Sequence, residues 1–442
     1  MKKVLYKTLG VLALSAIAAT TARAEHIFGS DQLDGKFGAA VRVRQEYWDN
    51  AFNLDDQAAD RNYFRLKSSV WGKFDYNGKY GAVVKLTNES YYYLHDFHDD
   101  NDGSLDLDEL VVDNLCVTAK DFLGMPVDLS IGRQDFLFTF GEGFLIMDGT
   151  PSDGSRTTYF NAARATVKIN PDNNVDLVAI SNTKYDDYLP SIHQYQKHQL
   201  NTSKETGFVV YGRSKINDNF SLEPYYIFKN EEEPAHYSAN ELDLHTFGAR
   251  GVYTTGPYQV RAEYCIQNGD YDSTNIDRDA WGGYVFANRT FKDVPLQPKF
   301  ELGFIDLSGD DPNTTDDEAF DPLFSRWPWL SELTIFTYTH ERDIAYATNL
   351  QQYRARLWLN LTDATKLDVA YSYLRANENL ATPGTGKDRG DLYQVKLSHK
   401  FTKTIDGYLL AEYFSPGDFY NADSYYNGDD AIFGRWQLQF KF

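Results

Sequence analysis

Apolar and polar residues alternate along this chain in one segment after another, and this period of two constrains the fold more than any other feature. Successive side chains of an extended strand point to opposite faces. In the final segment, Gln437–Phe442 (QLQFKF), Leu438, Phe440 and Phe442 share one face and polar residues fill the other. The alternation therefore predicts a chain built from β-strands, with Phe442 inside one of them.

Short turn signals and long acidic segments separate these strands in regular succession. Asn77-Gly78 lies between two alternating runs, which is the strongest short-range signal for a β-hairpin. No linker or change in composition divides the chain, so we predict a single domain over residues 25–442. Further short turns are predicted at Asn170–Asn174, Asn217–Asn219, Thr255–Pro257, Thr362–Thr365 and Thr402–Ile405.

The succession of short turns and long loops is typical of a transmembrane antiparallel β-barrel, an all-β fold with short periplasmic turns and long extracellular loops. The chain holds 32 Tyr, 29 Phe and 7 Trp, as expected for aromatic girdles at the membrane surfaces. No run of 18 apolar residues follows Ala24, which excludes spanning helices. A soluble β-sandwich is the alternative, but it rarely reaches this length without a domain boundary.

Closure of the barrel explains the final segment. In lipid every backbone N–H and C=O must be bonded within the protein, and a sheet achieves this only by pairing its last strand with its first. We therefore expect Phe442 to lie in the closing seam, in contact with the outer-membrane lipid at the aromatic girdle. A terminal Phe also resembles the signal that the barrel-insertion machinery reads in this class of protein.

Residues 1–24 predict a signal peptide. Lys2, Lys3 and Lys7 precede an uncharged stretch from Leu9 to Ala19, which is followed by the small-x-small sequence Ala22-Arg23-Ala24. The apolar stretch is too short to span a hydrocarbon core of about 30 Å as a helix. We expect cleavage after Ala24 and localisation in the outer membrane of a Gram-negative bacterium.

Nineteen segments qualify as strands, whereas single-chain bacterial barrels have an even number. Counting Leu333–Asp343 as a strand would make its neighbour run in the wrong direction. We assign it to an extracellular excursion between about Asp306 and Asn349, which leaves 18 strands. Barrels of 16 to 18 strands enclose an aqueous lumen.

Basic residues fall on the face that is turned away from the lipid. Val41 and Val43 belong to the lipid face of their strand, so Arg42 and Arg44 point inward. An Arg facing lipid at the midplane would cost about 2–4 kcal/mol, which favours this assignment. The same test predicts that the lumen is lined by Arg42, Arg44, Arg65, Lys67, Arg164, Lys168, Arg250, Arg261, Arg354, Arg356, Lys396 and Arg435.

The formal charge is −21, and −25 without the basic residues of the signal peptide, so a nucleic acid is not an expected partner. A basic lining in so acidic a protein indicates passage of anions, because guanidinium groups match carboxylates in a forked geometry. The alternative is that the arginines pair with inward acids, such as Glu46, Glu89 and Glu263, and only stabilise the wall.

The segment Ile131–Val167 resembles the signature of the alginate export family of outer-membrane barrels. The matching parts are Gly132-Arg133-Gln134, the glycines Gly141 and Gly143, and a strand with Phe160, Asn161, Ala163 and Arg164. The resemblance implies a channel for a polyuronate, in which arginines face one carboxylate per sugar. It makes Arg133 and Arg164 candidates for the pore lining, although a β-bulge must turn Arg133 inward from the face of Leu129 and Ile131.

Other motifs indicate less. The acidic segment at His98–Glu109 has spacing similar to a calcium loop, but His98 replaces the first acidic ligand, so a solvated loop is favoured. Cys116 and Cys265 belong to no spacing motif, and we infer neither a disulfide nor a metal site. No Ser and His motif predicts an enzyme, and no cofactor is expected.

Three functions remain open from the sequence. The first is a monomeric outer-membrane channel that passes an anionic saccharide ligand, such as alginate or a related uronate. The second is a less specific porin for small anionic solutes. The third is a structural or surface-interaction barrel whose lumen is plugged by long loops. Separately, Trp327 and Trp329 of the extracellular segment Asp321–Leu333 suit either stacking on sugars or packing of this loop against the rim, and packing is favoured.

Overall fold

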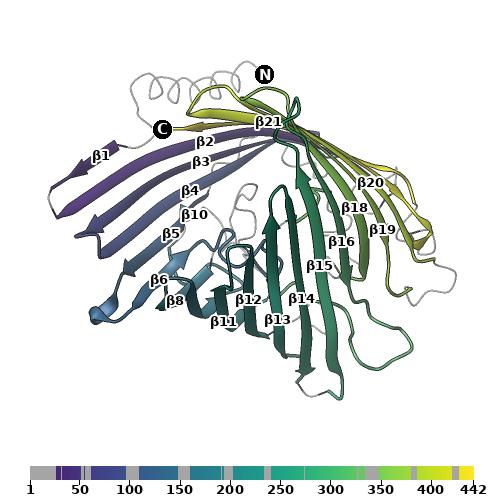
Figure 1. The fold of residues 1–442 in the computed structure, drawn as a ribbon, viewed down its shortest axis with the longest axis horizontal. Helices are drawn as coiled ribbons and strands as arrows, with labels where there is room; N and C mark the ends of the chain where they lie inside the picture. The colour runs from purple at the N-terminus through teal and green to yellow at the C-terminus, as the bar shows by residue number, and fades with distance from the viewer. Residues whose placement is uncertain are drawn as a thin grey trace.

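The computed structural model describes residues 26–30, 32–50, 54, 61–95, 109–147, 160–190, 192–193, 203–232, 240–272, 274–325, 328–333, 348–379, 386–420 and 428–442. Eighteen antiparallel strands pair in succession and close into a barrel. Figure 1 shows the wall that these strands form. The strands are β2 (Leu33–Asp49), β3 (Arg61–Tyr76), β4 (Tyr80–His95), β5 (Glu109–Ala119), β6 (Val127–Gln134), β8 (Phe160–Asn170), β9 (Asn173–Asn182), β11 (Glu205–Lys215), β12 (Phe220–Glu231), β13 (Leu242–Thr255), β14 (Tyr258–Tyr271), β15 (Asp277–Thr290), β16 (Lys299–Leu307), β18 (Leu350–Asn360), β19 (Thr365–Arg375), β20 (Asp388–Lys400), β21 (Ile405–Pro416) and β22 (Ala431–Lys441).

The barrel closes where its last strand meets its first. β22 pairs with β2 from Ala40 opposite Lys441 to Asp49 opposite Ile432. Phe442 continues the seam, because its backbone N–H donates to Ala39 O (2.8 Å) and its C=O accepts from Ala39 N (3.0 Å). In Figure 1 the purple strands of the N-terminus accordingly lie beside the yellow strands of the C-terminus. The expected closing seam is confirmed.

The predicted number of strands is also confirmed. β16 pairs directly with β18 over its whole length, so the connection between them, residues 308–349, adds no strand to the wall. The segment Leu333–Asp343, which the sequence excludes as a strand, lies outside the described part of the chain except for Leu333. The predicted signal peptide and the acidic segment at residues 98–108 lie outside it too, so both remain predictions.

Small elements supplement the wall. β1 (His26–Gly29) pairs with the first residues of β2, before the part of β2 that pairs with β22. β10 (Ile192–His193) pairs with the start of β5. β7 (Ile146–Met147) and β17 (Phe324–Ser325) form a separate parallel pair. Two short 3-10 turns lie at Phe122–Gly124 and Asp418–Tyr420. No helix within the described ranges is long and apolar enough to cross a membrane.

The short connections gather at one end of the barrel and the long ones at the other. Asn77 and Gly78 have φ of 56° and 66° and join β3 to β4 in the tight turn that the sequence predicts. The other predicted turns also join consecutive strands, at the ends of β8, β11, β13, β18 and β20. We call the two ends the short-turn end and the long-loop end.

Side chains alternate between the two faces of the wall. On β18, Tyr353 is 48% exposed whereas its neighbour Arg354 is 8% exposed. On β2, Arg42, Arg44 and Glu46 are buried while Val41 and Val43 are partly exposed. The period of two in the sequence thus separates an apolar outer face from an inner face that carries the charges.

Candidate functional site

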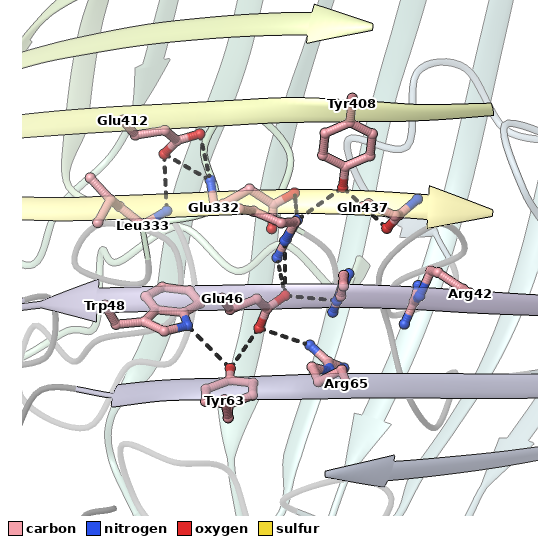
Figure 2. Close-up of polar contacts among 12 residues, drawn as sticks. Arg42, Glu46, Trp48, Tyr63, Arg65, Glu332, Leu333, Tyr408, Glu412 and Gln437 are labelled. Atoms are coloured by element: carbon pink, nitrogen blue, oxygen red, sulfur yellow. Dashed lines mark hydrogen bonds and ion pairs between the residues drawn. The ribbon is translucent and has the colours of Figure 1, made fainter. Parts of the chain in front are cut away.

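Buried charges of the inner face form a cluster at the closing seam. Glu46 of β2 is fully buried, and its Oε1 lies 2.6 Å from Arg435 Nη2 of β22 and 2.8 Å from Arg44 Nε. Its Oε2 accepts a hydrogen bond from the Tyr63 hydroxyl (2.6 Å) and lies 3.4 Å from Arg65 Nη1, both on β3. Figure 2 shows Glu46 on β2, between the neighbouring strands β22 and β3. One carboxylate therefore compensates guanidinium groups from three neighbouring strands.

Most other predicted basic residues are paired in the same way with an acid on a nearby strand or on a segment inside the barrel. This arrangement fixes the wall and neutralises much of its charge. Lys67 faces the lumen directly opposite Arg42. The pairs are Arg42 and Arg65 with Glu89, Arg164 with Asp176, Arg250 with Glu223 and Glu142, Arg261 with Glu301 and Glu142, and Arg356 with Asp368.

Arg133 is the exception in position, and the predicted inward orientation is wrong. Its strand register is unbroken, with Arg133 opposite Leu115 of β5, which is 43% exposed on the outer face. No bulge turns the residue inward, because Asp186 and Asn161 satisfy its guanidinium where it lies. Arg133 Nη2 and Nη1 donate to the two oxygens of Asp186 (2.7 and 3.0 Å), and Nε donates to Asn161 Oδ1 (3.0 Å).

Two segments from the long-loop end fold into the barrel. The first inward segment, residues 135–147, packs Phe140 on Tyr211 of β11 and Phe144 on Tyr284 of β15, with ring centroids 5.2 and 5.5 Å apart. Its Glu142 carboxylate contacts Arg250 and Arg261. Because these aromatic and acidic contacts lie on the inner face of distant strands, the segment narrows the lumen.

The second inward segment, residues 308–333 without 326–327, reaches the opposite part of the wall. Ser331 Oγ and the N–H groups of Glu332 and Leu333 donate to the Glu412 carboxylate of β21. Glu332 Oε1 lies 2.9 Å from Arg435 Nη1. Figure 2 shows Glu332 and Leu333 beside Glu412. The β7–β17 pairing joins this segment to the first one. The lumen therefore holds two connected segments, each anchored to the wall by charge and hydrogen bonds.

A cavity of about 130 Å³ remains beneath the second inward segment. Arg354 is buried there and donates a hydrogen bond from Nη2 to Gln394 Oε1 (3.0 Å), whereas its buried Nε has no hydrogen-bond partner among the described residues. Lys396 lies against the Tyr408 ring at 4.1 Å. No carboxylate of the described residues forms an ion pair with Arg354 or Lys396. The cavity is also lined by Pro328, Trp329, Leu330, Ser331, Glu332, Arg356, Asp368, Ala370, Leu410 and Glu412.

The structure thus brings the predicted basic residues, except Arg133, onto the inner face but does not collect them in one ring. Their role in passing a ligand stays a prediction. Sequence reasoning missed Glu142 and Glu332, which carry charge from the inward segments to the wall. A signal for Glu142 was present, because it stands between Gly141 and Gly143 in an otherwise apolar stretch. No group of three or more potential metal ligands lies within the described residues.

Comparison with known proteins adds two findings. A family model described as alginate export matches residues 34–433, and no curated protein matches. Similar solved structures include Acinetobacter baumannii OccAB2 (TM-score 0.57, 11% identity, covering 91% of this chain and 97% of that one) and OccAB4 (0.56, 12%, 91% and 97%). Pseudomonas aeruginosa OpdQ is similar too (0.55, 13%, 92% and 97%). At these identities the likeness shows the fold.

Proposed function

Because this chain belongs to the alginate export family, we propose that it is an outer-membrane channel that passes anionic saccharides, such as alginate or a related uronate, through a pore lined with basic residues. The family and the fold are those of transport channels. The observation that carries the choice of an anion is the cavity at Arg354 and Lys396, where neither cation forms an ion pair with a carboxylate of the described residues.

The paired and unpaired cations contribute differently. A guanidinium that is bonded to a wall carboxylate presents little net charge to a solute. Arg354 has donors left over, and its burial weakens the screening by water, so an approaching carboxylate gains more there than in bulk solvent. Lys396 adds a second positive charge on the same side of the cavity. These two residues are therefore the first at which we expect an anionic solute to bind.

The pairing of the remaining arginines supports a role in the wall as well as in the pore. Arg356 is bonded through Nε to Asp368 Oδ1 (2.8 Å) and stacks on Trp358 at 4.3 Å. A solute carboxylate reaches such a residue only by competing with the acid that it already holds. We propose that Arg42, Arg44, Arg65, Lys67, Arg164, Arg356 and Arg435 shape the electrostatic field of the pore more than they bind one ligand directly.

Current block by an oligouronate tests this function. In a planar bilayer, we expect current through the barrel to fall when an oligouronate is added on either side, and to stay unchanged with a neutral oligosaccharide of the same length. The replacement Arg354→Gln should weaken the block, whereas Arg289→Gln, on the outer face beside Tyr258, should not. Equal block by the neutral sugar would contradict a role of charge.

Two other functions have a specific observation in their favour. The pairing of most arginines suits a porin for small anionic solutes, which would show anion selectivity without block by the oligomer. The two inward segments suit a plugged barrel, which would show no stable open conductance. Liposome swelling with monomeric and oligomeric uronates distinguishes the porin for small solutes from the proposed saccharide channel. Single-channel recording of the intact protein distinguishes the plugged barrel from it.

A further inference from the structure

The tip of the first inward segment carries a carboxylate onto two guanidinium groups. Glu142 Oε1 lies 3.1 Å from Arg250 Nη2 and in closer contact with Arg261 Nε. The two arginines stand on neighbouring strands, β13 and β14. Gly141 and Gly143 flank the glutamate. We call these three consecutive residues, Gly141 to Gly143, the tip of the first inward segment.

The backbone of this tip is built to bring the carboxylate close to the wall. Gly141 and Gly143 have φ of +60° and +79°, which side chains other than glycine rarely adopt. A Cβ at Gly141 would come within 2.9 Å of Arg250 Cδ, so the backbone can approach the arginine only without a side chain. Phe140 and Phe144 anchor the tip on both sides through buried ring contacts.

Glu142 differs from the wall acids that hold the same arginines. Glu223 of β12 binds Arg250 Nη1 (3.2 Å), and Glu301 of β16 binds Arg261 Nη1 (3.0 Å). The Glu142 side chain is 24% exposed, compared with 16% for Glu223 and 6% for Glu301. Both contacts of Glu142 with the arginines are made by Oε1. Glu142 is thus the acid of this cluster that is most open to the lumen and that does not belong to a strand.

We propose that Arg250 and Arg261 form a carboxylate-binding site for solutes, which Glu142 of the same chain occupies in the structure. The inference rests on the proposed anion channel and deepens it, because it assigns one site and one chemical group, the carboxylate of a uronate or of a small organic acid. The chemistry is shown by the occupant itself: a carboxylate bridges the two guanidinium groups. A solute carboxylate replaces Glu142 when the tip side chain turns into the lumen.

Occupation by Glu142 lowers the affinity of the site for free carboxylates. An internal ligand is present at a high effective concentration, so a solute binds only in the fraction of molecules in which Glu142 has left. The apparent dissociation constant equals the intrinsic constant divided by that fraction, and is therefore larger. Low affinity favours a channel, since binding must be weak enough for the solute to leave again.

Two replacements of Glu142 separate occupation from simple charge. Glu142→Gln removes the charge and the bridging carboxylate. Glu142→Asp keeps the charge but withdraws the carboxylate by one methylene. Glu223→Gln is the matched control, because it removes one negative charge from the same arginine at nearly the same distance while leaving the tip intact.

Calorimetric titration of the detergent-solubilised full barrel with galacturonate, with galactose as the neutral probe, measures the binding. We expect Glu142→Gln and Glu142→Asp both to tighten galacturonate binding by about ten-fold or more, at low salt and near 1 M salt. We expect Glu223→Gln to give a smaller gain that disappears near 1 M salt, because it acts only through screened charge. An oligouronate arm distinguishes a polymer from a free organic acid as the source of the carboxylate.

Wild-type binding for Glu142→Asp together with a gain for Glu142→Gln would overturn the inference, since charge alone would then explain the result. Equal gains for Glu142→Gln and Glu223→Gln would overturn it as well. Heat-modifiable mobility checks that each variant is folded, and Glu142→Asp retains the charge if Glu142→Gln fails to assemble. Zero-current potentials recorded on the same preparations test the proposed function separately. Cation selectivity would contradict the channel for anions. Anion selectivity without any gain in galacturonate binding in the Glu142 variants would contradict only this site.

Discussion

Arg435 on the last strand of the barrel and Glu46 on the first lie 2.6 Å apart, from Nη2 to Oε1, and neither side chain is more than 2% exposed. The ion pair crosses the seam at which the wall closes. A buried pair contributes little over an apolar pair of the same shape, but the loss of one partner leaves a buried charge without compensation. The seam should therefore depend on both members together.

Glu46→Gln should lower the free energy of unfolding by about 3–5 kcal/mol, because Arg435 and two further guanidinium groups then lose their common carboxylate. Urea titration of the folded, heat-modifiable band measures the loss. Lys441→Gln is the control: its pair with Asp406 (2.9 Å) has half-exposed side chains and should contribute about 0–1 kcal/mol. Similar losses for the two variants would contradict a special role of the buried pair.

Gly141→Ala should enlarge the open lumen. The new methyl group meets Arg250 at 2.9 Å and the backbone at φ +60° is unfavourable for alanine, so the tip of the first inward segment must withdraw. We expect a higher single-channel conductance than in the wild type. Gly78→Ala, at φ +66° with no atom within 4 Å, carries the same backbone penalty away from the lumen and should leave the conductance unchanged. A conductance that does not change in Gly141→Ala would show that the segment does not limit the current.

The second inward segment should loosen as the pH rises from about 4 to 7. Burial, together with the nearby carboxylate of Asp317, raises the pKa of Asp310 to about 6. A raised pKa for an acid means that the folded segment holds the proton more tightly than the unfolded one. The stabilisation of the folded segment by protonated Asp310 is therefore complete below the ordinary pKa near 4. It is lost as the pH rises through about 6.

Hydrogen exchange measured by mass spectrometry tests this. Protection of residues 308–325 should fall between pH 5 and pH 7 beyond the intrinsic change in exchange rate, and Asp310→Asn should remove that fall. Asp311→Asn serves as control, because hydrogen bonds from Asn313 lower the pKa of Asp311 and its contribution changes only at more acidic pH. A pH effect that persists in Asp310→Asn would assign it to another group.

The strands and their faces could be predicted because the signal is local. A period of two places Arg42 and Val43 on opposite faces whichever strand they pair with, and Asn77-Gly78 fixes a turn within four residues. The closing seam followed from the need to bond every backbone group in lipid. These predictions need no knowledge of which distant strands become neighbours.

The charges inside the barrel could be predicted only in part. That Arg164 points inward follows from its own strand, but its pairing with Asp176 depends on the register between β8 and β9. The contact of Glu142 with Arg261 depends on how a long connection folds back, which aromatic packing decides. Alternation by itself placed Arg133 correctly beside Ile131 on the outer face. The error came from adding a bulge to agree with a resemblance.

The zero-current potential across a potassium chloride gradient tests the central claim most directly, when it is recorded for the wild type and for Arg354→Gln. We predict anion selectivity at 0.1 M salt, where the Debye length is about 10 Å, and a clear reduction of it in Arg354→Gln. Near 1 M salt the two proteins should converge, since screening acts within about 3 Å. Cation selectivity of the wild type, or equal potentials for the two proteins at 0.1 M, would contradict an anion channel whose selectivity depends on Arg354.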